Sequence, residues 1–248
     1  MSKETTHFGF ETIPAKTKKD RVASVFTSVA DQYDLMNDLM SLGLHRIWKK
    51  IAIQRAMIEP DQLVLDLAGG TGDLSQHILS KLKGSGHVIL SDINNAMLKK
   101  GQQRFVDIGI TKGLSFAQSD AEVLPFPNNT FDRVMMGFGL RNVTHKEKAL
   151  QEICRVLKPM GRAVILEFSK VSSPLFQSLY HQYSFSVIPK LGQWICQDPN
   201  SYQYLVESIE VHPDQETLRS MFLEAGFNQC DYQNLQGGIV ALHVGYKN

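Results

Sequence analysis

Short apolar segments alternate with helical segments through the middle of the chain, and no other feature of the sequence restricts the fold as strongly. Five apolar runs bounded by polar or turn-forming residues predict strands, at 63–67, 87–90, 114–117, 131–136 and 163–168. Segments between these runs carry a helical pattern, at 72–82, 95–108 and 146–157. Strands that alternate with helices form a mostly parallel sheet covered on both faces. The sequence therefore predicts an α/β fold.

The end of the chain follows a different pattern. Pro213 is expected to open a helix, which Gly226 ends. The segments 229–235 and 239–246 flank a Gln-Gly-Gly sequence, as the strands of an antiparallel hairpin do. Together with the five earlier strands, they predict a mostly parallel seven-stranded sheet with a C-terminal antiparallel hairpin.

The first quarter of the chain has a helical pattern. Apolar side chains recur at three- and four-residue steps over 22–33 and again over 44–51. The polar side of the second pattern carries three basic residues, Arg46, Lys49 and Lys50. We expect residues 1–60 to form an N-terminal helical extension that caps the substrate, and residues 61–248 to form a single domain.

The composition excludes several classes of protein. A formal net charge of +1 creates no field that attracts nucleic acid. The three cysteines, Cys154, Cys196 and Cys230, are widely spaced and form no CxxC motif, which argues against a disulfide framework and a metal site. Residues 1–20 are polar, and no apolar run is long enough to span a bilayer. The sequence predicts a cytoplasmic protein and leaves peripheral membrane contact open.

A glycine-rich loop, Asp66-Leu67-Ala68-Gly69-Gly70-Thr71-Gly72, ends the first predicted strand. Glycines at a strand-to-helix turn let the backbone approach a ligand, and the free N–H groups of the helix start bind an anion. The carboxylate of a methionine moiety and a pyrophosphate both suit such a loop. Without a ligand, the same sequence forms an ordinary tight turn.

Three acidic residues lie at or after successive predicted strands. Asp92 closes the second strand, where a carboxylate accepts hydrogen bonds from both ribose hydroxyls or caps the next helix. Asp66 suits an ammonium group and repels a pyrophosphate. Asp120-Ala121 follows the third strand, where the acid can accept from an adenine amino group and a backbone N–H can bind a ring nitrogen. Each acid alone fits an ordinary loop, but together they favour S-adenosylmethionine over a dinucleotide.

Longer stretches of the chain carry a more specific resemblance. They are Thr6–Phe10, Val29–Trp48, Asp66–Asp73, Ala121–Pro127, Gly137–Val143, Leu166–Lys170 and His212–Asp214. Over nearly its whole length the chain resembles the ubiquinone/menaquinone biosynthesis C-methyltransferase family. The sequences Gly-Leu-Arg-Asn-Val and Leu-Glu-Phe-Ser are the most specific parts of this resemblance. It implies a Rossmann-like class I methyltransferase fold and an enzyme dependent on S-adenosylmethionine.

The resemblance also implies a substrate and a cofactor site. The substrate is a polyprenylated benzoquinol of the ubiquinone pathway, a demethylmenaquinol of the menaquinone pathway, or both. The cofactor contacts carried over from the family are Thr71, Asp92, Asp120 and Ala121, and the loop residues Asp66, Gly70 and Gly72 complete the expected site. Gly137 stands where members of the family can carry serine, so its backbone can line the site but no hydroxyl is present there.

Methylation of a ring carbon requires that carbon to be nucleophilic. A phenol with a pKa near 10 is only about one part in a thousand ionised at neutral pH, so holding it as phenolate is worth roughly 4 kcal/mol. Arg141 is expected to stabilise the phenolate, with a surface salt bridge as the alternative. Asn142 is expected to orient a ring oxygen or to form a turn. The general base is left open between His45 and Tyr33, with His212 as a third candidate, and each also fits a structural role.

Two regions bear on partners. The apolar and aromatic segment at about 172–200 is a helical insertion that fits a packed helix or dimer contact, or a lid or channel for the isoprenoid tail. The basic helix around Trp48 fits contact with the cytoplasmic face of the inner membrane, or a solvated surface. A homodimer and a quinone-biosynthesis complex stay open.

Rival functions fit parts of the sequence. An NAD-dependent reductase explains Gly70–Gly72 and Asp92, but it has Ser75 at its third glycine position and leaves Asp66 and Asp120 unexplained. A non-catalytic scaffold of a quinone-biosynthesis assembly has no use for an intact loop and its acids. A nucleic-acid methyltransferase is disfavoured because the chain lacks a basic stripe.

Overall fold

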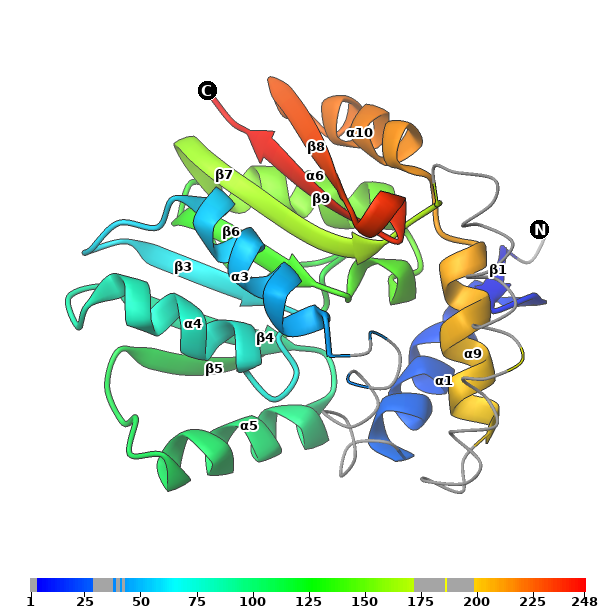
Figure 1. Cartoon of the computed structure of the whole chain (residues 1–248), viewed down its shortest axis with the longest axis horizontal. Helices are drawn as coiled ribbons and strands as arrows, with labels where there is room; N and C mark the ends of the chain where they lie inside the picture. Colours follow the sequence, from blue (N-terminus) through cyan, green and yellow to red (C-terminus); the bar gives the residue numbers. More distant parts are fainter. Residues whose placement is uncertain (1–3, 29–37, 39–40, 42, 172–185, 187–198) are drawn as a thin grey trace.

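A computed structural model describes residues 4–28, 38, 41, 43–171, 186 and 199–248 of the chain (Figure 1). Its centre is a seven-stranded sheet with the strand order β5-β4-β3-β6-β7-β9-β8. The strands are β3 (Leu63–Leu67), β4 (His87–Asp92), β5 (Leu114–Gln118), β6 (Phe131–Gly137), β7 (Leu157–Phe168), β8 (Gln229–Leu235) and β9 (Val240–Tyr246).

The strand directions confirm the predicted sheet. Every neighbouring pair from β5 to β7 is parallel. β9 is antiparallel to both β7 and β8, so the last strand of the chain inserts between β7 and the edge strand β8. A short 3₁₀ turn at Gln236–Gly238 joins β8 to β9, as expected for the C-terminal hairpin.

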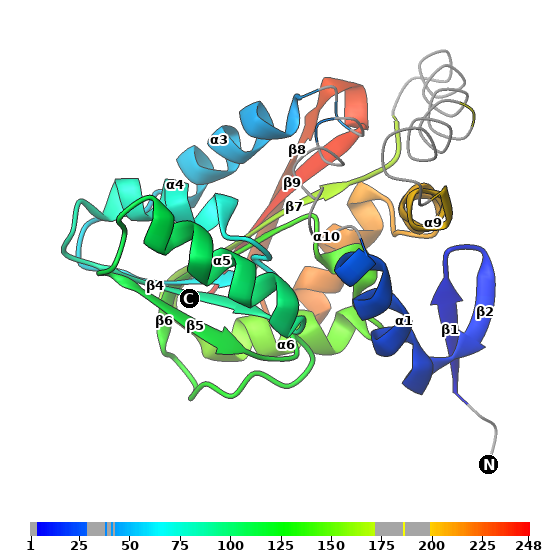
Figure 2. The ribbon, with the colours of Figure 1, turned by 90° about the horizontal axis from the view of Figure 1, so that it is seen from below.

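Helices cover both faces of the sheet (Figures 1 and 2). One face packs against α3 (His45–Ala56), α4 (Asp73–Leu82) and α5 (Asn95–Asp107), and the other against α6 (Lys146–Val156) and α10 (Gln215–Glu224). Along β3, Val64 belongs to the core of the first face and Leu65 to that of the second. Because successive side chains of a strand point to opposite faces, a central strand that is apolar throughout is buried on both sides.

The N-terminal part of the chain holds a hairpin as well as helices. β1 (Thr5–Phe8) pairs with β2 (Glu11–Pro14), and α1 (Ala15–Ser28) follows directly. α1 lies beside α9 (Pro199–Glu210) in both views (Figures 1 and 2). The helical patterns predict α1 and α3, but the sequence predicts neither the hairpin nor α9. Strands of four residues are too short to show a period of two clearly.

The start of β7 differs from the prediction. The strand begins at Leu157, six residues before the predicted start at 163, and therefore contains Pro159 and Gly161. Leu157 pairs with Phe131, and an irregularity in the β6–β7 register follows that pair. A proline is tolerated in a strand at such a bulge because the ladder is interrupted there.

The start of α10 also differs. Asp214, not Pro213, is the N-terminal cap, and its Oδ1 accepts the backbone N–H of Thr217 at 2.8 Å. Pro213 lies just before the cap. Its ring has no side-chain oxygen to accept a hydrogen bond from the free N–H groups of the first turn, whereas Asp214 has one.

Some expectations fall outside the described residues. Of the predicted insertion at about 172–200, only residue 186 and the start of α9 are described. Tyr33 also lies outside the described residues. Among the described helices, none is long and apolar enough to cross a membrane.

Candidate functional site

Three acidic residues meet at the carboxyl edge of the parallel strands. Asp66 is the last but one residue of β3, Asp92 ends β4, and Asp120 follows β5. These three strands are direct neighbours in the sheet. Ligands of open parallel sheets bind at this edge, because the loops after the strands form a crevice there.

An open cavity, here called the main cavity, lies at this edge and encloses about 800 Å³, counted with its opening to solvent. The sheet side of its wall includes Gly70, Asp92, Asp120 and Ala121. Helix α1 lines it as well, through Lys19, Val22, Ala23 and Phe26. A mostly apolar wall with a few polar groups is typical of small-molecule sites. The N-terminal extension therefore forms part of the wall of the main cavity.

A second cavity of about 350 Å³, counted in the same way, adjoins the first. Its wall holds Lys49, Asp66, Gly69, Thr71, Asp73, Leu74 and Gly137. Ala68 and Phe138 line both cavities, and both adopt left-handed backbone angles, with φ of 55° and 60°. Non-glycine residues rarely hold this conformation, and the strain collects at binding sites. The two cavities therefore meet at two strained strand ends.

Asp92 is held by backbone N–H groups. Its Oδ2 accepts from Gly70 at 2.9 Å, and its Oδ1 accepts from Asn94 at 2.8 Å. Burial raises the pKa of Asp92, and these backbone hydrogen bonds act in the opposite direction. A carboxylate oxygen can accept more than one hydrogen bond, so Asp92 keeps acceptor capacity for a ligand of the main cavity.

Asp66 is fully buried, and only one of its oxygens has a partner among the described residues. Ser75 donates its hydroxyl to Oδ2 at 2.6 Å, whereas Oδ1 has none. Burial raises the pKa of Asp66 to about 7. A Cβ at Gly69 would lie 2.8 Å from the carboxyl carbon of Asp66, so the loop needs glycine there. Thr71 Oγ1 is also buried and has no partner in the described part of the chain, so the second cavity presents unsatisfied polar atoms.

Asp120 forms an ion pair with Lys19 of α1. Its other oxygen accepts the backbone N–H of Glu122 at 2.9 Å, and Lys19 lies 3.5 Å from the Glu122 carboxylate. Lys19 is not recognisable as a cavity residue from the sequence alone. Its only signal is a lysine-rich start to the first helical segment, which does not show where that helix packs.

The amino-acid sequence matches the model of a known protein family. Residues 14–247 fit the model of the ubiE/COQ5 methyltransferase family. The chain belongs to this family.

Two relatives are similar over nearly their whole length. The "Ubiquinone/menaquinone biosynthesis C-methyltransferase UbiE" of Coxiella burnetii (strain RSA 331 / Henzerling II) is 54% identical over 246 residues, which cover 99% of this chain and 98% of that protein. The protein of the same name from Methylococcus capsulatus (strain ATCC 33009 / NCIMB 11132 / Bath) is 52% identical over 247 residues, which cover 100% of both.

Solved structures share the fold. A SAM-dependent methyltransferase from Aquifex aeolicus superposes with a TM-score of 0.59 and 16% identity, covering 79% of this chain and 88% of that one. A SAM-dependent methyltransferase from Thermotoga maritima gives a TM-score of 0.62 and 17% identity, covering 91% of this chain and 99% of that one. The class I methyltransferase fold is confirmed, and the family confirms an S-adenosylmethionine-dependent enzyme.

In this methyltransferase, Arg141 and Asn142 have different surroundings. Arg141 is 4% exposed, and its guanidinium lies 2.8 Å from the Glu167 carboxylate. It is not part of either cavity wall. Asn142 lines the main cavity, and its Oδ1 accepts the hydroxyl of Tyr204 at 2.9 Å. Asn142 therefore faces the main cavity, while Arg141 holds the same loop from its buried side.

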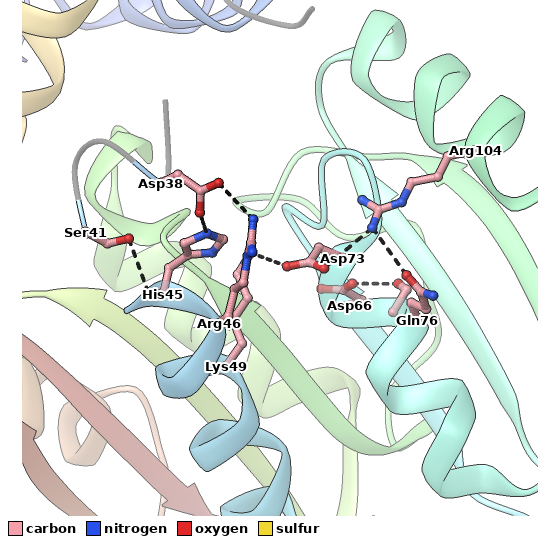
Figure 3. A network of polar contacts seen from close by, with 10 residues as sticks. Asp38, Ser41, His45, Arg46, Lys49, Asp66, Asp73, Gln76 and Arg104 are labelled. Atoms are coloured by element: carbon pink, nitrogen blue, oxygen red, sulfur yellow. Dashed lines mark hydrogen bonds and ion pairs between the residues drawn. The ribbon is translucent and has the colours of Figure 1, made fainter. Parts of the chain in front are cut away.

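His45 belongs to a polar network that extends from α3 to α5 (Figure 3). Its Nε2 lies 2.9 Å from Asp38 Oδ1, and its Nδ1 is buried without a partner among the described residues. Burial lowers the pKa of His45, while the hydrogen bond that the ring donates to Asp38 acts in the opposite direction. The ring is thus neutral at neutral pH. Neither His45 nor His212 lines the main cavity or the second cavity.

The position of Lys49 corrects the sequence analysis. The helical pattern places Lys49 on the polar side of its helix with Arg46 and Lys50, but Lys49 is only 7% exposed. Its ammonium group donates to Asp73 Oδ2 at 2.6 Å. Because α3 packs beside α4, a lysine on that side meets the acid in the first turn of α4.

Proposed function

We propose that the chain methylates a ring carbon of a polyprenylated benzoquinol in the ubiquinone pathway, of demethylmenaquinol in the menaquinone pathway, or of both, with S-adenosylmethionine as methyl donor. Both relatives described above carry the two pathways in their names and are more than half identical to the chain. One structural observation supports the proposal above all others: the strand-end acids border two joined cavities.

The main cavity suits the adenosine part of the cofactor. Asp92 accepts hydrogen bonds from the ribose hydroxyls, and Asp120 with the backbone of Ala121 binds the adenine edge. Gly70 holds Asp92 through its N–H group. Adenine binding at Asp120 has to share that carboxylate with Lys19, which the two lone pairs of each oxygen permit.

The second cavity suits the amino-acid part of the cofactor. The unpartnered Oδ1 of Asp66 is placed to accept from an ammonium group. Gly72, with φ of +85°, is the N-terminal cap of α4, and Thr71 and Gly137 line the wall. A Cβ at Gly137 would meet only Leu74 at 3.8 Å, so a serine there would also fit. When bound, the cofactor supplies an electrophilic methyl group on a sulfonium.

The residues of the chain must stabilise the anionic oxygen of the substrate ring. The hydroxyl of Tyr204 occupies Asn142 Oδ1, so the amide N–H groups of Asn142 are left to donate to that oxygen. A direct contact of Arg141 with the phenolate stays a prediction, and it requires Arg141 to exchange Glu167 for the substrate. His45 is the described candidate for the proton acceptor, because Asp38 binds one ring nitrogen and the other has no partner among the residues that the structure describes.

Binding experiments separate this function from its rivals. Calorimetric titration with S-adenosylhomocysteine should give binding, and NADH should give none, because Asp66 in the wall of the second cavity repels a pyrophosphate. Asp92→Asn should weaken the S-adenosylhomocysteine complex about tenfold, by the loss of charged hydrogen bonds, and the exposed Asp231→Asn should not. Binding of NADH alone would contradict the proposal. Accumulation of unmethylated quinone precursors in cells that lack the protein would then identify the substrate.

Peripheral contact with the cytoplasmic face of the inner membrane is a further part of the proposal. Trp48 does not serve as an anchor, because it is 1% exposed and donates to Gln236 at 3.1 Å. The outer side of α3 instead presents Ile47, which is 53% exposed, beside Arg46 and Lys50. Flotation with anionic liposomes tests this contact, and the absence of flotation contradicts it. The proposals of a homodimer and of a quinone-biosynthesis complex rest on the sequence, and light scattering tests the first.

A further inference from the structure

A buried lysine from the N-terminal extension, Lys49, lies in the wall of the second cavity. Figure 3 shows its side chain pointing toward Asp73. The side chain of Lys49 is 8% exposed, and its Nζ lies 2.6 Å from Asp73 Oδ2. A buried ammonium group is costly unless it is paired and hydrogen-bonded. The bond to Asp73 uses one of its three N–H donors. Lys49 therefore has donors left at a cavity wall.

The same cavity carries both signs of charge. Asp66 is fully buried in the wall, with Oδ1 unpartnered among the described residues. Arg104 lies 3.6 Å from the second oxygen of Asp73, so Asp73 is already shared between two cations. A small cavity with an acid and a cation in its wall suits a ligand that carries an ammonium group and a carboxylate close together.

The start of α4 adds to the preference for an anion. Gly72 is the cap of this helix, and no side chain caps its first turn. Thr71 Oγ1, one residue earlier, is buried, has no partner within the described ranges and lies in the same wall. Free N–H groups and the dipole at a helix start favour a negative group. These donors and Lys49 border one cavity.

We propose that Lys49 binds the carboxylate of the amino-acid end of the cofactor while Asp66 binds its ammonium group. The inference rests on the proposed function, since it concerns the same cofactor. An α-amino acid carries its two charges on one carbon, so both must be satisfied within one small cavity. The extension supplies one of the two partners, which makes residues 45–56 part of the cofactor site.

The alternative is that the Lys49–Asp73 pair serves the fold alone. In that case the loss of Lys49 lowers stability, but it does not change how the protein distinguishes ligands with and without a carboxylate. S-Adenosylmethionine and its decarboxylated form differ only in that group. The ratio of their dissociation constants, here called the carboxylate ratio, therefore reports a direct contact.

The experiment is isothermal titration of the full chain with both ligands in the absence of quinol, so that no methyl transfer occurs. The wild-type carboxylate ratio should be about 10 to 100, the range for hydrogen bonds to charged groups. Lys49→Met should lower this ratio about tenfold, the share of one charged hydrogen bond, and Lys49→Arg should keep most of it. The affinity for 5′-methylthioadenosine, which lacks the whole amino-acid end, should not change in either variant.

Two further variants control for folding. Lys81→Met removes an exposed lysine of α4 and should leave the carboxylate ratio at its wild-type value. The double variant Lys49→Met/Asp73→Asn removes both charges of the pair, so Asp73 is not left as a carboxylate without its lysine. If Lys49→Met does not fold, the carboxylate ratio is measured on this double variant instead. The inference is overturned if a folded variant without Lys49 keeps the wild-type carboxylate ratio. It is also overturned if the wild-type protein itself has a carboxylate ratio of one. If the wild-type protein binds neither S-adenosylmethionine nor 5′-methylthioadenosine, the proposed function fails as well.

Discussion

The guanidinium of Arg141 lies 2.8 Å from the carboxylate of Glu167, with 3% and 1% of the two side chains exposed. Glu167 also accepts the backbone N–H of Arg141 at 3.1 Å and that of Phe168 at 2.9 Å. The pair joins the loop after β6 to the end of β7. Because Asn142 follows Arg141 directly and lines the main cavity, this buried pair fixes the position of a residue that faces the ligand.

Removal of Arg141 should therefore affect stability and turnover more than cofactor binding. Arg141→Ala leaves the Glu167 carboxylate buried without a cation, which should lower the free energy of unfolding by about 3–5 kcal/mol. Turnover should fall further than S-adenosylhomocysteine affinity, because Arg141 lines neither cavity. Urea unfolding and calorimetry measure the two effects. The control variant Arg141→Met/Glu167→Gln removes both charges and should recover part of the lost stability. If Arg141→Ala lowers the free energy of unfolding by less than about 1 kcal/mol, the pair is not effectively buried.

The hydrogen bond from Tyr204 to Asn142 should control turnover without affecting the cofactor. Tyr204→Phe removes one hydroxyl at 2.9 Å from Asn142 Oδ1 and should cost about 1 kcal/mol of stability. The amide of Asn142 is then free to rotate, so kcat should decrease while S-adenosylhomocysteine affinity stays at its wild-type value. The partly exposed Tyr232→Phe serves as the matched control. A decrease in cofactor affinity as large as that in kcat would place Tyr204 in the cofactor site instead.

Asp66 should make the stability of the ligand-free protein decrease as the pH rises. Its pKa is about 7 in the folded protein, above the ordinary value for an aspartate, so the folded state binds the proton more tightly than the unfolded state. The stabilisation is complete below about pH 4 and is lost as the pH rises through about 7, with a total of roughly 4 kcal/mol at most.

Chemical unfolding of the wild type and of Asp66→Asn between pH 4 and 8 measures this loss. The neutral amide cannot titrate, so the difference between the two proteins should grow with pH in favour of the variant. Saturating S-adenosylmethionine should reduce the difference, because an ammonium group at Asp66 stabilises the carboxylate. A difference that does not depend on pH would rule out Asp66 as a titrating group in this range.

Local patterns in the sequence predict most of the sheet and its helices. Residues 63–67 form one strand with the predicted bounds, because a central strand of a covered sheet is apolar on both faces. The placement of the acids follows from the same logic: in a parallel sheet, the ends of successive strands lie at one edge. Local pattern and global fold agree in these segments.

The contacts that complete the site could not be predicted, because they join residues far apart in the chain. Lys49 and Asp73 are 24 positions apart, Arg141 and Glu167 are 26 apart, and Lys19 and Asp120 are 101 apart. A helical pattern shows which residues share a side of a helix, but it does not show which second helix covers that side. This is why Lys49 was expected in solvent and lies instead in a cavity wall.

The Asp38–His45 pair should determine the acidic side of the pH–rate profile if His45 accepts the ring proton. His45 must be neutral to act, and burial lowers its pKa below 6.5, so kcat/KM should decrease only below that pH. Asp38 and Asp73 raise this pKa and Lys49 lowers it. Asp38→Asn should therefore move the acidic limb to lower pH and reduce the maximal rate, because the ring loses the carboxylate that orients it. His45→Gln should abolish the acidic limb and most of the turnover, while S-adenosylhomocysteine affinity is retained. The control is His87→Gln, at an exposed contact with Ser115, which should leave the pH–rate profile unchanged. An acidic limb that does not move in Asp38→Asn would exclude His45 as the base and direct attention to Tyr33.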